Sequence, residues 1–456
     1  MIVKPLLFLL LAAGQGLCYL ILLALGNLKE NIVWAEVWFF VAFLLYWASL
    51  AVLNISPVAG DRKGIAPAFP GKSSGSAPNA AFYITSIILC ACCFRFILWL
   101  SAPSLSDDIY RYVWEGKIFA AGLNPFTHAP ADLSLQAFRD KEIYPSINHK
   151  ELATIYPPLS LFIFRLCAHV SATVAAMKIT FILFDLLTIG TLFLILRALY
   201  IPPVYIIIYA WNPLVIMEFA GSGHLDSAGI FFLILALYLF IAGKRAGSTV
   251  CLTLSFLVKF LPGMFIPFML GKRKARQLLI FLLLAGMCYI PFLDAGDKLF
   301  NSLTQYSQRW VFNASLFDLF ALIFQSSTVA RLVAAAIFIC VFLALFIKVM
   351  RQPAPVCQQS IISMVFMLLG CTFILTPVLY PWYLCWIIPL LVIIPNRAWL
   401  MLSGSIFLSY LVWKGYVEAG IWEEKFWVKA VEYVPFYILL LYDGLRGLRR
   451  ETTLHE

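Results

Sequence analysis

The sequence predicts an all-α fold: a polytopic membrane bundle of about 12 spans, with one broken-helix hairpin. Two observations carry this prediction. Of the 456 residues, 62% are hydrophobic and 12% are charged, and the mean hydropathy is +0.91, whereas about 25% of the residues of a soluble domain are charged. The apolar residues also gather in repeated stretches of about 20, the length that crosses a bilayer as a helix.

The charge of the chain fits a membrane protein rather than a nucleic-acid-binding protein. The net charge is +10, but the Lys and Arg residues form no single run. They occupy short segments between apolar stretches, as cytoplasmic loops of membrane proteins do. The 11 cysteines form no CxxC pair, and most lie in apolar stretches, so we expect them to be small buried residues. The lipid bilayer is therefore the expected partner, and nucleic acid is not.

Four segments follow from the pattern along the chain. Residues 1–53 hold two N-terminal spans, 54–80 form a Gly-, Pro- and Ser-rich linker, 81–447 form the main bundle, and 448–456 form a tail. The first apolar stretch is longer than that of a signal peptide, which favours a retained span. The predicted spans cover residues 6–25, 33–53, 81–100, 175–196, 204–219, 227–241, 278–292, 329–349, 361–376, 384–394, 399–412 and 434–445.

Basic residues orient this bundle. The linker at 54–80 has a basic excess, so we expect it and both chain ends in the cytoplasm. The long loop at 101–158 then lies on the extracytoplasmic side. Residues 156–170 are apolar but too few to span. If they lie along the outer interface, every later basic loop falls inside, and we therefore prefer that placement.

The apolar segment 248–270 is expected to form a hairpin of two short helices. Lys259 and Pro262 interrupt its middle, and basic clusters flank both of its ends. Both ends are therefore expected in the cytoplasm. Non-helical backbone at that depth needs protein or a water-filled cavity around it.

The outer loop 101–158 carries the adjacent carboxylates Asp107 and Asp108 just beyond the third predicted span. The residues DDIYRYVWEGKIFAAG predict a short helix with both acids at its start, where one carboxylate can cap the helix and the other can face a site. A carboxylate there can take a proton from an attacking hydroxyl. The alternative is that both are solvent-exposed capping residues.

Several cations accompany these acids. Arg111, Lys117 and Arg309 are predicted on the outer side and could hold a phosphate, with a surface role as the alternative for each. Arg95 and Asp185 lie inside predicted spans, where a charge is costly and points to a function or a buried hydrogen bond.

Aromatic residues mark two of the later outer loops. Trp310, Tyr380, Trp382 and Tyr383 could line a sugar or lipid site. The alternative is an aromatic belt at the membrane interface, which is common in membrane proteins.

Six sequence blocks occur in a fixed order between residues 101 and 391: SDDIYRYVWEGKIFAAGLNPF, INHKELATIYPPLS, WNPLVIMEFAGSGHLDSAG, LVKFLPGMFIPFML, RWVFNASLFDLF and LYPWYLCWIIPLL. Together they resemble the GT-C membrane glycosyltransferases. They are most similar to bacterial polyprenyl-phosphate-mannose-dependent mannosyltransferases of the glycosyltransferase family 87 type. One departure is that two spans and a linker precede the outer loop, where many members of the superfamily have one span.

This resemblance implies a reaction. A hexose, mannose, passes from a polyprenyl-phosphate donor to a hydroxyl of a glycolipid or glycan acceptor, on the extracytoplasmic side of the plasma (inner) membrane, and the anomeric carbon inverts. Asp108 is expected to be the general base, with Asp107 as the alternative, and no cofactor is implied. No metal is required, although a divalent ion at the two carboxylates is an alternative. The residues expected to bind substrate are His224, Arg95, Arg111, Asp226, His149, Tyr156, Arg309, Trp310, Asn313, Tyr380, Trp382 and Tyr383.

Two other classes compete with this interpretation. A transporter or flippase predicts ionisable residues along the spans and a repeat between the two halves, whereas this chain concentrates its ionisable residues in outer loops. Another enzyme of lipid-linked glycans, of polymerase or ligase type, predicts a large late outer loop, whereas the largest loop here is early and acidic.

Overall fold

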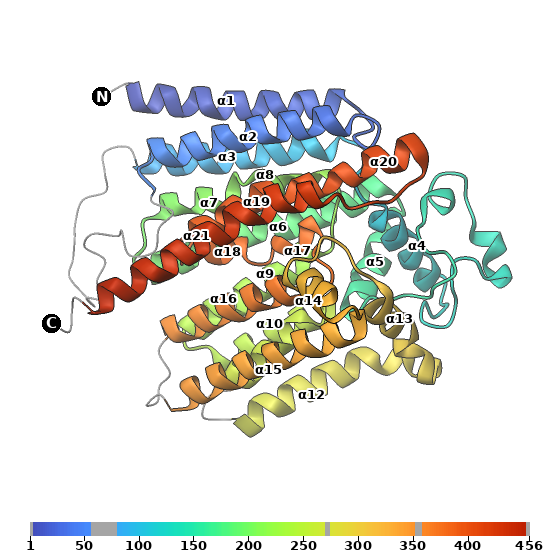
Figure 1. The fold of residues 1–456 in the computed structure, drawn as a ribbon. Helices are drawn as coiled ribbons and strands as arrows, with labels where there is room; N and C mark the ends of the chain where they lie inside the picture. Colours follow the sequence, from blue (N-terminus) through green and yellow to red (C-terminus); the bar gives the residue numbers. More distant parts are fainter. Residues whose placement is uncertain (1–2, 56–79, 270–273, 352–357, 453–456) are drawn as a thin grey trace. The chain divides into compact units, whose positions relative to one another are not determined.

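The structure, a computed structural model, describes residues 3–55, 80–269, 274–351 and 358–452. Within these ranges the regular structure is helical, apart from an isolated bridge between Phe312 and Val378. This confirms the predicted all-α fold (Figure 1). The predicted linker falls almost entirely on residues 56–79, which lie outside the described residues. The chain forms two compact units.

Eight of the described helices are long and apolar enough to cross a membrane, or nine if the bent pair Pro203–Ala210 and Pro213–Gly221 is one span. The chain is a multi-pass membrane protein, as its composition predicts. The predicted count of about 12 spans is not confirmed. Some of the expected spans are shorter helices, among them Asp226–Ile241 and Pro381–Leu391.

Unit 1 comprises Met1–Leu98, Leu199–Ile216 and Tyr380–Glu456. Its helices are α1 (Val3–Ala24), α2 (Ile32–Val52), α3 (Ala80–Trp99), η3 (Pro203–Ile206), α7 (Ile207–Ala210), α8 (Pro213–Ile216), α17 (Pro381–Leu384), α18 (Ile388–Leu391), α19 (Arg397–Ser405), η7 (Ile406–Leu411), α20 (Val412–Ala419) and α21 (Phe426–Thr452).

The break between α7 and α8 is held by the first three helices. Gln15 of α1, Tyr46 of α2 and Arg95 of α3 each donate a side-chain hydrogen bond of 2.8 Å to a backbone carbonyl within residues 208–211. All three side chains are buried. A helix interrupted inside a membrane leaves carbonyls without helical partners, and these donors satisfy them.

Unit 2 comprises Trp99–Ala198 and Met217–Leu379. Its helices are α4 (Asp108–Ala120), η1 (Leu133–Phe138), η2 (Tyr144–Ser146), α5 (Pro158–Val170), α6 (Val174–Ala198), η4 (Met217–Gly221), α9 (Asp226–Ile241), α10 (Arg245–Val258), η5 (Leu261–Phe265), α11 (Ile266–Met269), α12 (Lys274–Tyr289), η6 (Ile290–Phe300), α13 (Asn301–Arg309), α14 (Leu316–Phe324), α15 (Ser327–Met350) and α16 (Gln358–Leu375).

The helices of unit 2 run between two ends of different chemistry. α9 and α10 are antiparallel, because the hydroxyls of Ser248 and Ser255 on α10 donate to carbonyls of α9 at 2.9 and 2.6 Å. Asp226 at the start of α9 and Lys259 just after α10 therefore share one end. That end also carries α4 and α13, on the right of Figure 1, and is called here the α4 end.

The opposite end of unit 2 is basic. In its described turns and helix ends the charged side chains are all Lys or Arg, with no acidic residue among them. They are Arg197, Lys244, Arg245, Arg276, Lys348 and Arg351. Basic short loops of this kind are typical of the cytoplasmic side of a membrane protein.

The predicted hairpin is confirmed. α10 runs from the basic end and stops at Val258, where Lys259 takes an extended conformation with φ −153° and ψ 135°. η5 and α11 lead back, and α12 begins beside the start of α10, where the hydroxyl of Thr249 donates to the Gln277 side chain at 2.7 Å. Lys259 thus stands at the tip of the hairpin.

α4 and α5 pack closely at the α4 end. A Cβ on Gly116 would lie 2.4 Å from the carbonyl oxygen of Phe164, so only glycine permits this approach. The rings of Tyr112 and Phe164 stack with centroids 4.8 Å apart. After α5 the chain returns to where the outer loop began, because the Trp99 indole donates to the Ala175 carbonyl at 3.0 Å. α5 therefore does not cross unit 2.

Candidate active site

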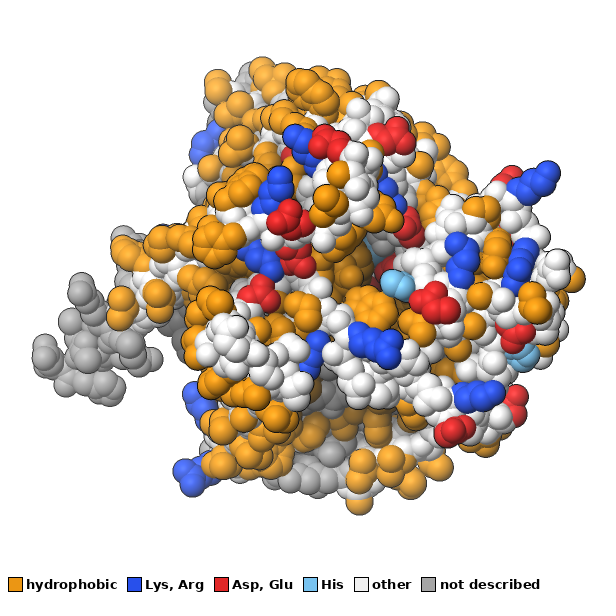
Figure 2. Space-filling model, turned by 45° about the vertical axis from the view of Figure 1, so that its right-hand side comes forward, with side chains coloured by type: hydrophobic (Ala, Val, Ile, Leu, Met, Phe, Trp, Pro, Cys, Tyr) orange, Lys and Arg blue, Asp and Glu red, His pale blue; other side chains and the backbone are white. Residues whose placement is uncertain are grey.

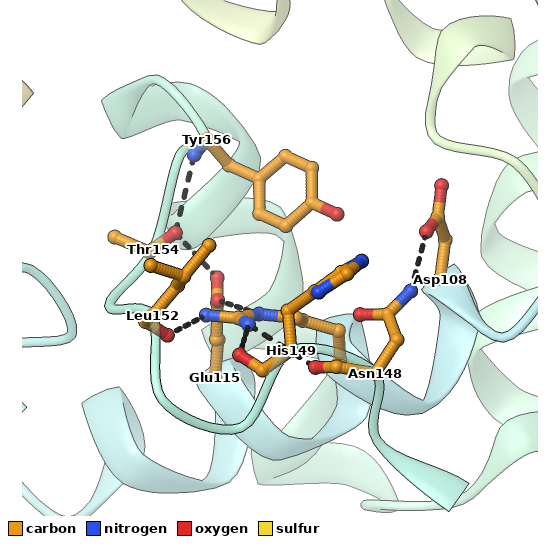
Figure 3. Close-up of polar contacts among 8 residues, drawn as sticks. Asp108, Glu115, Asn148, His149, Leu152, Thr154 and Tyr156 are labelled. Carbon is orange, nitrogen blue, oxygen red and sulfur yellow. Dashed lines mark hydrogen bonds and ion pairs between the residues drawn. The ribbon is translucent and has the colours of Figure 1, made fainter. Parts of the chain in front are cut away.

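Asp108 is the first residue of α4, as the sequence predicts. Its side chain is 25% exposed, and its Oδ1 accepts a hydrogen bond of 3.1 Å from the Asn148 amide (Figure 3). The hydroxyl of Ser106 accepts from the Asp108 backbone N–H at 3.3 Å. Asp107 occupies the N-cap position without a side-chain capping bond. The Ser106 hydroxyl, rather than either carboxylate, therefore accepts this backbone hydrogen bond at the start of the helix.

The surroundings of Asp108 tune its protonation. Burial raises the pKa of Asp108 to about 6, and the charges of Asp107 and Asp226 act in the same direction. The hydrogen bond from Asn148 and the charge of Lys259 oppose this rise. A carboxylate with a pKa near the working pH is suited to accept a proton and release it again.

Through Asn148, one oxygen of Asp108 is connected to a group that we call the Arg111 cluster. This cluster consists of Arg111, Glu115, Thr154 and the backbone carbonyls of 148–152. Arg111 Nε lies 3.0 Å from Glu115 Oε1 on the next turn of α4. The same guanidinium donates to three carbonyls within 148–152, and the Thr154 hydroxyl donates to Glu115 Oε2 at 2.6 Å. Figure 3 shows these bonds fastening the 148–156 segment onto α4.

This arrangement accounts for the position of Asn148. Arg111 and Glu115 are 5% and 2% exposed, so their ion pair is shielded from water. A guanidinium can donate to several oxygens at once, and the oxygens that accept from Arg111 here belong to the protein. The prediction that Arg111 contacts substrate has no support in this geometry, because the guanidinium is enclosed by the loop that it holds.

The other oxygen of Asp108 faces what we call the Lys259 cluster: Glu218, His224, Asp226 and Lys259. His224 Nδ1 lies 3.8 Å from Asp108 Oδ2, and its Nε2 lies 3.4 Å from Glu218 Oε2. Lys259 Nζ lies 2.6 Å from Asp226 Oδ1. The structure therefore brings together Asp108, His224 and Asp226, three of the predicted site residues.

Burial differs sharply within the Lys259 cluster. Glu218, His224 and Asp226 are at most 1% exposed, whereas the Lys259 side chain is 27% exposed. Burial and the neighbouring Lys259 ammonium lower the pKa of His224 well below its usual range. The His224 imidazole beside Asp108 is therefore neutral near pH 7 and enclosed.

Gly223 allows the His224 loop to approach α4. Its φ is +73°, and a Cβ there would lie 2.5 Å from Ile109 Cδ1 and 3.0 Å from Lys178 Cγ. Both the backbone conformation and the space favour glycine. The GSGHLD segment singled out in the sequence thus gains its contact with Asp108 from this residue.

Four predicted ligands lie in the outer loop after α4 or in the loop after α13. His149 has the rare positive φ of 41°, and its ring lies 4.9 Å from that of Trp310 in an edge-to-face contact. Figure 3 shows the Tyr156 phenol and the His149 ring extending to the side where the Asp108 carboxylate lies. Asn313, also at positive φ, is 2% exposed in the loop after Trp310.

Of the remaining predicted ligands, Arg309 belongs to unit 2 and the other four belong to unit 1. Arg309 ends α13 and is exposed. Arg95 belongs to unit 1, is 1% exposed, and is engaged with backbone carbonyls there. Tyr380, Trp382 and Tyr383 form an aromatic cluster of unit 1, with centroids of neighbouring rings 4.4 to 5.8 Å apart. Their contacts with substrate stay predictions.

The loops after α4 come forward in Figure 2, where charged side chains of both signs mix with other polar groups. Hydrophobic side chains predominate on much of the remaining visible surface. Lys117 in the last turn of α4 pairs with Asp140 of these loops at 2.9 Å, and each of the two side chains is 33% exposed. Lys117, another predicted phosphate cation, is thereby paired on the surface.

Sequence reasoning missed two residues at this site and noted a third without its partners. Asn148 precedes the expected His149 and gave no signal of its own. Glu218 could have been found, since it is a carboxylate within an apolar stretch. Lys259 was noted as a charge in the hairpin, but the partners Asp226 and Asp108 were not foreseen.

No three His, Cys, Asp or Glu side chains of the described residues come together as a metal-ion site. The chemistry visible here is that of a partly open carboxylate, one cation and a buried imidazole. This set can remove a proton from a hydroxyl and stabilise a nearby negative charge.

The family model described as MptA_B family, alpha-(1->6)-mannopyranosyltransferase, N-terminal domain, matches residues 31–272. This range is more than half of the 456-residue chain. The chain belongs to this family. A search of the curated proteins found no match.

The protein is therefore a membrane mannosyltransferase, which confirms the predicted enzyme class. The matched range contains Asp108, Asn148, the Arg111 cluster and the Lys259 cluster. The matched range thus includes Asp108 and both clusters that face it, and family membership weighs against the transporter alternative.

Proposed function

We propose that this mannosyltransferase transfers mannose from a polyprenyl-phosphate donor to a hydroxyl of a glycan or glycolipid acceptor, on the extracytoplasmic side of the plasma membrane. The acceptor oxygen attacks the anomeric carbon and the bond from that carbon to the phosphate oxygen breaks. The electron pair of that bond leaves with the lipid phosphate, the hydroxyl proton passes to Asp108, and the configuration inverts.

The observation that carries the proposal is the setting of Asp108. A general base has to reach the proton and to be ionised at the working pH. Asp108 is partly exposed, is held on one oxygen by Asn148, and has a pKa of about 6. Near neutral pH most of it is ionised, yet it holds a proton better than an ordinary aspartate does.

Two further observations support the lipid donor and the sidedness. The site belongs to a unit of membrane-length helices, so a donor anchored in the bilayer can reach it without leaving the membrane. The opposite end of unit 2 carries only basic charges in its described turns, as cytoplasmic loops do. The α4 end then faces away from the cytoplasm.

A transfer assay tests the proposal. Purified protein in detergent is given radiolabelled polyprenyl-phosphate mannose and a lipid and glycan extract of the source membrane, beside the variant Asp108→Asn. The variant keeps the size of the side chain and its hydrogen bond acceptor, so it should fold, but its rate should fall by at least about 100-fold.

Asp107→Asn is the matched control, because it removes the neighbouring charge and keeps the helix start. Loss of transfer in Asp108→Asn with activity retained in Asp107→Asn supports the assignment of the base. The reverse pattern moves the base to Asp107. A wild-type enzyme that uses a nucleotide sugar and ignores the lipid donor refutes the proposed donor.

A further inference from the structure

Lys259 is a charge at an unusual place. It follows α10, at the tip of a hairpin whose two arms are apolar, and its extended backbone separates α10 from η5. A charge inside an apolar membrane segment is costly and is usually retained for a function. The alternative is a purely internal role, in which Lys259 neutralises the buried Asp226.

Exposure distinguishes Lys259 from the acid it meets. Asp226 is 1% exposed in its side chain, whereas that of Lys259 is 27% exposed. The charge of Lys259 acts on both Asp108 and His224, so its ammonium belongs to the surroundings of the proposed base. An ammonium is a compact charge with several donors, which can hold a carboxylate on one side and a second anion on the other.

Four other cations of unit 2 are enclosed, paired or exposed to solvent. Arg111 is enclosed by its own cluster, and Lys178, 1% exposed, donates to the Ser101 carbonyl at 2.6 Å. Lys117 pairs with Asp140 on the surface, and Arg309 is exposed, where water and salt screen its charge. Lys259 combines proximity to Asp108 with partial access.

We infer that Lys259, positioned by Asp226, binds the phosphate of the sugar donor and stabilises the negative charge that the phosphate gains as it leaves. This inference rests on the proposed function, since it supplies the counterpart of the Asp108 base. When the bond from the anomeric carbon to the phosphate oxygen breaks, its electron pair stays on the phosphate. Lys259 keeps its proton and meets that charge electrostatically. In one displacement, Asp108 thus takes the proton of the attacking hydroxyl and Lys259 stabilises the charge on the leaving phosphate.

The test is a binding measurement that needs no turnover. A long-chain polyprenyl monophosphate without sugar is titrated into the purified full-length protein in detergent, and its Kd is measured by displacement of a fluorescent polyprenyl phosphate. The variants are Lys259→Gln, Asp226→Asn and the double variant of both. Lys117→Gln is the matched control, because it removes a lysine from another Lys–Asp pair of the same unit.

A phosphate role predicts that Lys259→Gln raises the Kd at least about tenfold, while Lys117→Gln leaves it unchanged. The double variant removes both charges of the pair together and so avoids a buried unpaired carboxylate. It should fold, and it should bind the lipid phosphate as weakly as Lys259→Gln. Lys259→Arg, which keeps the charge, should recover part of the affinity.

Two results overturn the inference, and they are distinguishable. If the double variant binds the lipid phosphate as the wild type does, Lys259 serves only to neutralise Asp226, and the proposed function stands. If the wild-type protein itself does not bind polyprenyl phosphate but transfers mannose from another donor, the proposed donor fails and the inference fails with it.

Discussion

The two oxygens of Asp108 face two polar clusters that differ in how far their ion pairs are exposed to solvent. The Arg111 cluster is closed: its ion pair is buried, and its donors are spent on the backbone of 148–152. The Lys259 cluster is open on one side, where the lysine is 27% exposed while its partner Asp226 is enclosed.

This difference shows what each ion pair is for. A closed pair fixes geometry, because every change of its partners leaves a charge without compensation. An open pair keeps a charge available at the edge of the site. Counting charged residues in the sequence does not separate the two kinds, so it cannot distinguish the enclosed Arg111 from the partly exposed Lys259.

The largest effect on stability is expected from the closed pair. Glu115→Ala leaves the Arg111 guanidinium buried beside carbonyls alone, and breaking a buried pair in this way costs about 3–5 kcal/mol. Unfolding of the purified protein in mixed micelles by a denaturing detergent should show this loss. A change below about 1 kcal/mol would mean that the cluster does not fix the loop.

The approach of the two clusters can be disturbed at Gly223. Gly223→Ala places a methyl group 2.5 Å from Ile109 Cδ1 at a φ of +73°, so His224 should move away from Asp108. We expect the transfer rate to fall at least about tenfold, from strain of about 1–3 kcal/mol. Gly122→Ala is the control: its φ is +83°, but nothing lies within 4 Å of the added Cβ. Equal losses in both variants would trace the effect to backbone strain alone.

The link between the closed cluster and catalysis is Asn148. Its hydrogen bond to Asp108 lowers the pKa of that carboxyl. In Asn148→Ala the pKa should therefore rise by about one unit, as expected for loss of a hydrogen bond to a charged group. The acid limb of kcat/KM should shift to higher pH by the same amount, while activity well above that limb is largely kept. A lower rate at every pH without a shift would make Asn148 a packing residue only.

The wild-type enzyme should itself report the state of Asp108. The base works only when ionised, and burial raises the pKa of Asp108 to about 6. The value of kcat/KM should therefore rise with pH through about 6 and fall tenfold for each unit below it. A limb near pH 4, typical of an exposed aspartate, would contradict this setting.

The smallest effect is expected from the exposed pair at Lys117. Lys117→Ala removes an ion pair whose members are each 33% exposed. Pairs of this kind contribute at most about 1 kcal/mol. Detergent unfolding should therefore move little, and transfer should be unchanged. A loss of stability similar to that of Glu115→Ala would remove the distinction between buried and exposed ion pairs.

Local patterns predicted much of the fold. Hydropathy indicated the helical membrane class, and the acidic start of α4 and the charge in the 248–270 hairpin are each visible within a short window of sequence. The predicted count of about 12 spans is not confirmed, because apolar length alone does not separate full spans from short and broken helices. Asp226 and Lys259, 33 residues apart, meet through the antiparallel packing of α9 and α10, which no local pattern encodes.

The candidate site, like the fold, was predictable where a short stretch of sequence carried the signal and not where distant residues meet. Asp108 and His224 could be proposed from their blocks, since a carboxylate and an imidazole in outer loops are chemically conspicuous. Asn148 could not, because its importance depends on a contact with a residue 40 positions earlier in the chain. The enclosure of Arg111 could not be predicted either, because it depends on how the 148–152 backbone folds over α4.

The broken helix of unit 1 has a consequence for the order in which the chain assembles. The carbonyls of 208–211 need the donors of Gln15, Tyr46 and Arg95, and lipid offers none. These donors lie on α1, α2 and α3, which precede the interrupted segment in the chain, so they are synthesised before the carbonyls that they bind. When the interrupted segment inserts after these helices, it avoids an intermediate in which its carbonyls lie in hydrocarbon without hydrogen-bond donors.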